Sequence, residues 1–317
     1  MTAPVPARPD LELLRIEVDK FRAAETAAIT EYGYSRDWMN FCAWCKRTGC
    51  VPLPASSETL CLFIADQLTN KKVSTACRRA AAVCSIHQRA GYPSPSDNSV
   101  RQLLRGARRI RAEQPRQMRP LSVLELRQVA GILSEKRTRI ATRNCGIVVV
   151  AFASALRRSN ISMLRMEDVT FCAEGFIILV RKEKNDPQSV GRLIPMPHGS
   201  NELTCPVRAL KAWLALRGSQ KGPLFTRLDS NRKSETEALS FNAIGKIVKK
   251  AIAATGIDAA LSGCHSLRAG LITEAGIAGV SPLVIAATSG HRSLDSLKDY
   301  FRPIGLFKAC AAGQIGL

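Results

Sequence analysis

Side chains that could handle an anionic group gather near the C-terminal end of the sequence, in the stretch CHSLRAGLITEAGIAGVSPLVIAATSGHRSLDSLKDYF. His265 and Arg268 have i, i+3 spacing, so a helix would place a proton carrier and a cation on one face, where both can address one anion. His291 follows Gly290 at a predicted helix start, and Tyr300 comes nine residues after it. Each feature alone is ordinary, because a lone tyrosine is usually a core or interface residue and an H-x-x-R pair is common by chance. It is their combination, in this order, that indicates a catalytic site.

Basic residues farther upstream extend the pattern. The segment SALRRSNISMLRMEDV places Arg157 directly after an apolar helix, and VRKEKN places Lys184 in a predicted β-hairpin, with Lys182 as the competing choice. The pattern resembles the signature of the tyrosine recombinases, also called the phage integrase family. That signature has, in order, an arginine, a hairpin lysine, H-x-x-R, Gly-His and a tyrosine. The resemblance covers roughly residues 25–305.

The resemblance implies a site-specific DNA recombinase that cuts and rejoins strands without metal, ATP or other cofactor. Tyr300 would attack a scissile phosphate, giving a 3′-phosphotyrosine and a free 5′-hydroxyl. Arg157 and Arg268 would hold the nonbridging oxygens and balance the extra negative charge of the transition state. Two such rounds would make and resolve a Holliday junction.

The same resemblance assigns the proton transfers and the partners. His265 and His291 would assist through hydrogen bonds and proton transfer, and Lys184 would protonate the departing 5′-oxygen, a role that suits lysine because its pKa shifts readily. The expected partners are a double-stranded DNA recombination site and further copies of the chain, as a homo-tetramer in the synaptic complex. Residues 306–317 would dock on a neighbouring subunit.

One departure from the family pattern leaves alternatives open. Three residues after the first arginine the family usually has an acid, and this sequence has Asn160. An amide can hydrogen-bond and orient a neighbour, but it supplies no charge to hold Arg157. One alternative is therefore a catalytically idle DNA-binding protein of the same fold. The other is a type IB topoisomerase-like enzyme, which also forms a phosphotyrosine.

Net charge independently indicates a polyanionic partner. The 317 residues include 46 Lys plus Arg against 26 Asp plus Glu, a formal charge of +20, and residues 71–120 hold twelve bases against two acids. Nucleic acid is the leading candidate and an anionic membrane surface the weaker one. The predicted DNA contacts are Arg78, Arg79, Arg101, Arg105, Arg108 and Arg109.

The sequence shows no membrane or secretory signal. It has no run of about 18 apolar residues and no apolar region at its N-terminus. A cytoplasmic, nucleoid-associated protein is expected. The eleven cysteines are odd in number and scattered, which favours reduced thiols over a disulfide framework. Cys42, Cys45 and Cys50 could begin a zinc site, but Cys42 and Cys45 share a helical face with aromatic residues and are more typical of a core.

The expected fold is mainly α with a small β-sheet: a helical N-terminal core-binding domain and an α+β catalytic domain that form a clamp around DNA. The expected divisions are a flexible leader at 1–24, the helical domain at 25–112, a Pro-containing linker at 113–120, the catalytic domain at 121–305 and the docking segment at 306–317.

Helical and strand periods predict the elements that position these residues. Apolar residues recur at helical spacing in four N-terminal segments, and the segments 121–133 and 141–156 also have helical patterns. The runs 176–180 and 193–196, separated by a turn-rich stretch, predict a β-hairpin. Three further residues have structural interpretations: His87 and His198 as surface or helix-packing residues, and Trp213 as core.

Overall fold

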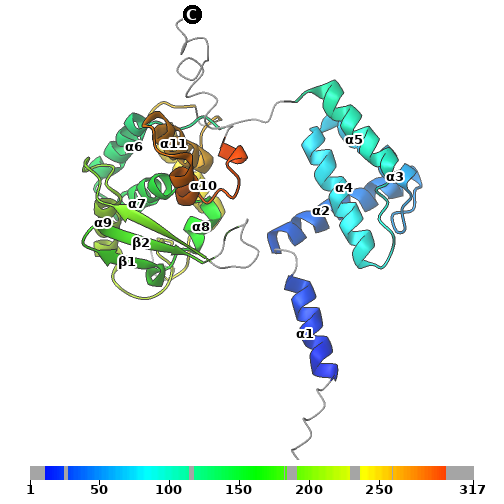
Figure 1. Ribbon diagram of the computed structural model, residues 1–317, viewed down its shortest axis with the longest axis horizontal. Coiled ribbons are helices and arrows are strands. Elements are labelled where there is room, and N and C mark those ends of the chain that lie inside the picture. The colour runs from blue at the N-terminus through cyan, green and yellow to red at the C-terminus, as the bar shows by residue number, and fades with distance from the viewer. Residues whose placement is uncertain are drawn as a thin grey trace, which may run out of the picture. The chain divides into compact units, whose positions relative to one another are not determined.

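The computed structural model describes residues 11–24, 28–113, 118–181, 183, 191–228, 236–258 and 260–297. The chain divides into two compact units, Met1–Pro115 and Arg116–Leu317 (Figure 1). The division lies inside the stretch 113–120 that the sequence predicts as a linker. The two units are described separately below.

Five helices form unit 1: α1 (Leu11–Ala24), α2 (Ala28–Thr48), α3 (Ser57–Asn70), α4 (Val73–Arg89) and α5 (Asn98–Arg111). The last four are the predicted helical segments. Helix α1 occupies residues 11–24 of the expected leader. Its sequence, LELLRIEVDKFRAA, consists mostly of good helix formers and has an acidic residue in the first turn, which suits the positive end of the helix dipole.

Aromatic side chains form the centre of unit 1. Phe41 and Phe63 are fully buried, with ring centroids 4.9 Å apart, and Cys45 is buried beside them. The interpretation of Cys45 as a core residue is therefore confirmed. His87 is also buried: Nε2 accepts the Ala55 N–H at 2.9 Å, and Nδ1 lies 2.8 Å from the Val83 carbonyl. It joins α4 to the loop before α3, as a packing residue.

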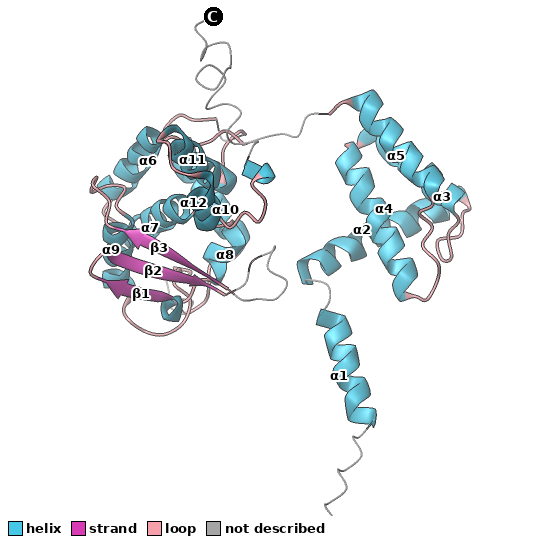
Figure 2. Ribbon diagram, in the orientation of Figure 1, coloured by secondary structure: helices cyan, strands magenta, loops and turns pink. Residues whose placement is uncertain are grey.

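Unit 2 contains seven helices and one sheet among its described residues (Figure 2). The helices are α6 (Val123–Glu135), α7 (Arg139–Ser154), α8 (Arg158–Met163), α9 (Pro206–Arg217), α10 (Phe241–Ala253), α11 (Cys264–Ile277) and α12 (Pro282–Ser289), and a 3-10 turn spans Met166–Asp168. The sheet has the order β1 (Val169–Cys172), β2 (Gly175–Val180), β3 (Arg192–Pro197), with both pairs antiparallel.

Helix α7 lies at the centre of unit 2 and contacts α6, α9, α10 and α11. Its segment Ile147–Ala151 is buried without a break, so it is a core helix. Trp213 on α9 is fully buried as predicted, and its indole N–H donates to the Leu224 carbonyl at 2.8 Å. Helix α11 packs closely on α7 at Gly270, where a Cβ would lie 2.7 Å from the Phe152 ring and would collide with the Leu121 carbonyl. Only glycine permits this approach.

The predicted hairpin is confirmed as β2 and β3, with Ile178 opposite Ile194 and Phe176 opposite Met196. These four side chains are buried and face the core. The short strand β1, which the sequence patterns did not predict, extends the sheet beside β2.

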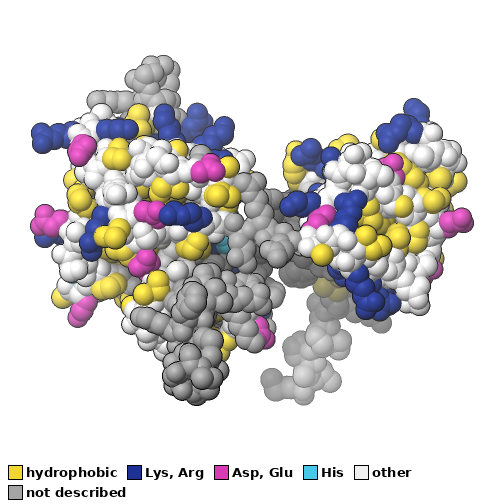
Figure 3. Space-filling model, turned by 90° about the horizontal axis from the view of Figure 1, so that it is seen from above, with side chains coloured by type: hydrophobic (Ala, Val, Ile, Leu, Met, Phe, Trp, Pro, Cys, Tyr) yellow, Lys and Arg dark blue, Asp and Glu magenta, His cyan; other side chains and the backbone are white. Residues whose placement is uncertain are grey.

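The surface carries charged and apolar side chains together. In the view of Figure 3, Lys and Arg side chains lie on both units, interspersed with apolar ones. Among the described residues, no helix combines the length and the apolar character needed to cross a membrane.

Candidate active site

Arg268 is the most buried cation of the site. It lies on the second turn of α11 and is 3% exposed. Its Nη1 donates to the Ala155 carbonyl at 2.7 Å. Ala155 follows the last residue of α7 in the left-handed conformation, with φ 49°, and this turn presents its carbonyl to the guanidinium. The central helix of the core therefore holds Arg268 in place.

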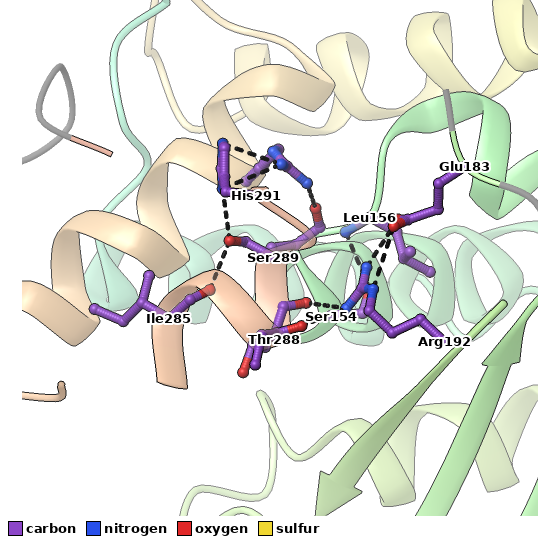
Figure 4. A network of polar contacts seen from close by, with 11 residues as sticks. Ser154, Leu156, Glu183, Arg192, Ile285, Thr288, Ser289 and His291 are labelled. Carbon is purple, nitrogen blue, oxygen red and sulfur yellow. Dashed lines mark hydrogen bonds and ion pairs between the residues drawn. The ribbon is translucent and has the colours of Figure 1, made fainter. Parts of the chain in front are cut away.

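His291 lies directly against Arg268. The Nη2 atom of Arg268 is 3.2 Å from Nε2 and 3.4 Å from Nδ1 of the imidazole. The Ser289 hydroxyl lies 2.6 Å from the Ile285 carbonyl, to which it donates, and 2.7 Å from Nδ1 of His291 (Figure 4). Because the Ser289 hydroxyl donates its proton to the Ile285 carbonyl, it can only accept from the imidazole. Nδ1 therefore carries the imidazole proton and donates to Ser289. Nε2 is then the nitrogen that can accept from Arg268.

The position of His291 corrects one prediction. The sequence suggested that Gly290 and His291 lie at a helix start, whereas the structure places them after the end of α12. Gly290 adopts the left-handed conformation, with φ 69°, that terminates helices, and its N–H donates to the Ala286 carbonyl at 2.8 Å. The turn aims His291 back toward α11.

Burial, together with nearby positive charge, lowers the pKa of both histidines and favours their neutral form. Burial lowers the pKa of His291 to about 4, and the positive charges of Arg268 and Arg157 add to the effect. The pKa of His265 is also lowered, first by desolvation of its ring and then by Arg268 and Arg157. At pH 7 each ring can accept a proton or a hydrogen bond.

Arg157 brings a second guanidinium to the same place. It lies between α7 and α8, as the residue that precedes the first turn of α8. Its Nη1 atom is buried and has no hydrogen-bond partner among the residues that the structure describes. Asn160, on α8, is 3% exposed. An amide at this position supplies no negative charge to pair with Arg157.

Of the six predicted catalytic residues, the structure brings four together: Arg157, His265, Arg268 and His291. The other two, Lys184 and Tyr300, lie outside the described residues, as do Lys182 and the predicted docking segment 306–317. Among the described residues, no group of three His, Cys, Asp or Glu side chains could hold a metal ion.

Residues that the sequence analysis did not identify complete the site. Arg192, the first residue of β3, pairs with Glu183 at 2.8 Å and donates to the carbonyls of Ala287 and Thr288 at the end of α12 (Figure 4). Ser289 fixes the tautomer of His291. The Ser-Gly-His sequence places Ser289 near His291, but no local pattern links residues 183 and 192 to a helix nearly a hundred residues away.

The predicted DNA-binding arginines fall into two groups. The four on α5 are exposed: Arg101, Arg105, Arg108 and Arg109. The two on α4 both interact with the buried Asp37. Arg78 pairs with it while its side chain stays 51% exposed. Arg79 is only 16% exposed, lies 3.6 Å from Asp37 and donates to Gln67. Arg79 thus faces the interior of unit 1, where it joins α4 to α2 and α3.

Comparison with known proteins identifies the family of this chain. The model of the phage integrase family matches residues 122–304. The integrase/recombinase xerD homolog of Selenomonas ruminantium is 31% identical, over 96% of this chain and 90% of that protein. The recombinase cre of Escherichia phage P1 is 24% identical, over 94% and 91%. The crystal structure of a lambda integrase tetramer bound to a Holliday junction shares the fold, with a TM-score of 0.61 at 13% identity, over 92% of this chain and 76% of that one. The family match and the 31% identity together show that this chain belongs to the phage integrase family of tyrosine recombinases.

Proposed function

We propose that the protein is a site-specific DNA recombinase that breaks and rejoins duplex DNA through a 3′-phosphotyrosine. The observation that carries the proposal is the convergence of Arg157 and Arg268 with two neutral histidines. Two forked cations and two proton acceptors suit one phosphodiester group.

The arginines would bind the scissile phosphate. Arg268 is oriented from one side by the Ala155 carbonyl and from the other by His291. Arg157 adds a buried donor, and a buried donor without a partner costs about 1–3 kcal/mol. A nonbridging phosphate oxygen would satisfy that donor. Both guanidinium groups would then balance the charge that develops on the phosphorus centre, and this positioning precedes the reaction.

The histidines would divide two tasks. His291 donates to Ser289 and can accept from Arg268, so it would orient the guanidinium. His265 is neutral at pH 7 because its surroundings lower its pKa, so it would accept the phenolic proton of Tyr300. As the bond from the phenolic oxygen to phosphorus forms, the bond to the 5′-oxygen breaks, and Lys184 would give that oxygen its proton.

The rejoining step would reverse these transfers on a partner duplex. A 5′-hydroxyl attacks the phosphotyrosine, and the phenol leaves and regains a proton. The reaction would need no ATP, because the covalent intermediate retains the energy of the phosphodiester bond. We propose a homo-tetramer on two recombination sites, acting in the cytoplasm at the nucleoid, with the exposed arginines of α5 on DNA phosphates and residues 306–317 docked on a neighbouring subunit.

The decisive experiment traps the covalent intermediate. We choose duplexes with short inverted repeats from the DNA that flanks the gene. Each duplex carries a nick just 3′ of a candidate cleavage position, so that the short fragment released with a 5′-hydroxyl diffuses away. The wild type should form an adduct that survives denaturation, and Tyr300→Phe should form none. Tyr92→Phe is the matched control, because Tyr92 is an exposed tyrosine of unit 1. An adduct with Tyr300→Phe would refute the assignment of the nucleophile.

The trapping experiment also tests one alternative, and plasmid relaxation tests the other. The buried amide of Asn160 favours a catalytically idle DNA-binding protein, which would bind the duplexes and trap no adduct on any of them. A topoisomerase-like enzyme would relax supercoiled plasmid that lacks the inverted repeats.

A further inference from the structure

We propose that Glu183 and Arg192, docked together on the end of α12 beside His291, form a positioning pair for the general-acid lysine that neighbours Glu183 in the sequence. The inference rests on the proposed function, because it concerns delivery of the proton to the 5′-oxygen.

The pair joins two described residues that stand on either side of residues 184–190 in the sequence. Glu183 comes three residues after the end of β2, and Arg192 opens β3. The carboxylate and the guanidinium make two contacts, Nη2 to Oε1 at 2.8 Å and Nε to Oε2 at 3.3 Å. Fixing the ends of a loop removes much of its conformational freedom before any substrate arrives. Glu183 is flanked in sequence by Lys182 and Lys184, the two candidates for the general acid.

Arg192 also docks this pair on α12. Its Nη1 donates to the Ala287 carbonyl at 2.9 Å and to the Thr288 carbonyl at 2.6 Å. These are terminal carbonyls of a helix, where a cation is favoured by the helix dipole. The next residues along the chain are Ser289, Gly290 and His291. One guanidinium thereby connects Glu183 to the segment that carries a proposed catalytic histidine.

The local packing shows that this contact is closely fitted. A Cβ on Gly290 would lie 2.7 Å from Oε2 of Glu183 and 2.9 Å from Nη2 of Arg192. A side chain at position 290 would therefore displace the ends of Glu183 and Arg192, and the φ of 69° itself favours glycine. The side chains of Glu183 and Arg192 are only 10% and 18% exposed. Burial of a charge pair is expensive unless its hydrogen bonds are met, and the four contacts of Arg192 meet them.

The general acid gives the pair a distinctive chemical readout. Protonation matters for an oxygen leaving group, whereas a 5′-thiol, with a pKa of about 8.5, leaves without it. If the pair places the acid, its loss should slow cleavage of the ordinary phosphodiester and should have little effect on a phosphodiester with sulfur at the 5′-bridging position. General acid catalysis typically contributes about 10²–10⁴-fold, so the loss on oxygen should reach about 100-fold.

The test measures single-turnover cleavage of nicked duplexes with oxygen or sulfur at the bridging position. The variants are Glu183→Gln and Arg192→Lys, with Lys184→Ala and Lys182→Ala as references for a missing acid. Glu237→Gln is the matched control, since it breaks an ion pair of the same 2.8 Å length that is exposed and remote in sequence. Because both rates scale with the fraction of active protein, the sulfur-to-oxygen ratio still reports on the acid when a variant is partly unfolded.

We expect the sulfur-to-oxygen ratio to rise in Glu183→Gln as it does in one of the two lysine variants, and to stay at the wild-type value in Glu237→Gln. Equal losses on oxygen and sulfur, or no loss, would overturn the positioning role. If the wild type cleaves neither substrate, the proposed function itself fails and the positioning role fails with it. Cleavage by the wild type therefore distinguishes failure of the positioning role from failure of the proposed function.

Discussion

The arginines of the active site and those of α5 differ in how the protein surrounds them. Arg268 is buried and held by a backbone carbonyl and an imidazole, so its guanidinium has one orientation. Arg105 and Arg109 are exposed on the surface of α5. A buried cation with fixed partners can balance charge at a defined point, whereas a flexible surface cation is suited to contacts with a phosphate backbone. If the proposed function holds, most of the net charge would serve DNA binding and a few buried charges would serve the chemistry.

The largest effect should come from replacing the fixed cation with a flexible one. Arg268→Lys keeps the positive charge but loses the planar fork that reaches Ala155 and His291 together. We expect cleavage of the nicked duplex to fall about 1000-fold, the upper range for loss of one preorganised donor, while the affinity for DNA changes by only a few-fold. Single-turnover rates and titration by fluorescence anisotropy measure the two quantities.

Arg127→Lys, a substitution at an exposed arginine of α6, is the control for the change of residue type. If Arg268→Lys weakened DNA binding as much as it slowed cleavage, the division of labour between the two sets of arginines would be wrong.

The histidine beside that cation predicts a dependence of stability on pH. The pKa of His291 is about 4 in the folded protein against 6.5 when unperturbed. Between these values the unfolded chain binds one more proton than the folded chain, so the free energy of unfolding decreases as the pH falls from 6.5 to 4. His291→Gln should remove this part of the loss, on the order of 2 kcal/mol once the full value of the shift is reduced for the solvent that screens a half-buried ring.

Chemical denaturation across that pH range measures the effect in unit 2. His198→Gln is the comparison, since His198 lies exposed in the turn after β3. A slope with pH that is the same in His291→Gln and in the wild type would show that the ring is not held neutral by its surroundings.

The sequence predicted elements whose periodicity is local. Helix α7 and the β2–β3 hairpin have clear apolar patterns, and the order of the catalytic residues was sufficient to place four of them in one site. The sequence patterns failed where contacts between distant parts of the chain determine the local structure. The left-handed turn at Gly290 ends α12 where a helix start was expected, and the carbonyls that accept from Arg192 lie nearly a hundred residues away in the chain. Charge counts likewise could not distinguish Arg79, which contacts Asp37 and Gln67 inside unit 1, from the exposed Arg78 beside it.

The smallest effect should come from the surface arginines. The double variant Arg105→Ala and Arg109→Ala removes two proposed phosphate contacts, so the slope of log affinity against log salt should become shallower by about 0.9 per contact. Affinity should fall about tenfold at moderate salt, alike for specific and random duplexes, because phosphate contacts carry no sequence information directly. Arg79→Ala is the matched control: it should leave the slope unchanged and lower the stability of unit 1, since its guanidinium lies against Asp37 and Gln67. If Arg79→Ala changed the slope equally, exposure in the folded domain would not decide which arginines reach DNA. The contrast between buried and surface cations would then hold only for the active site.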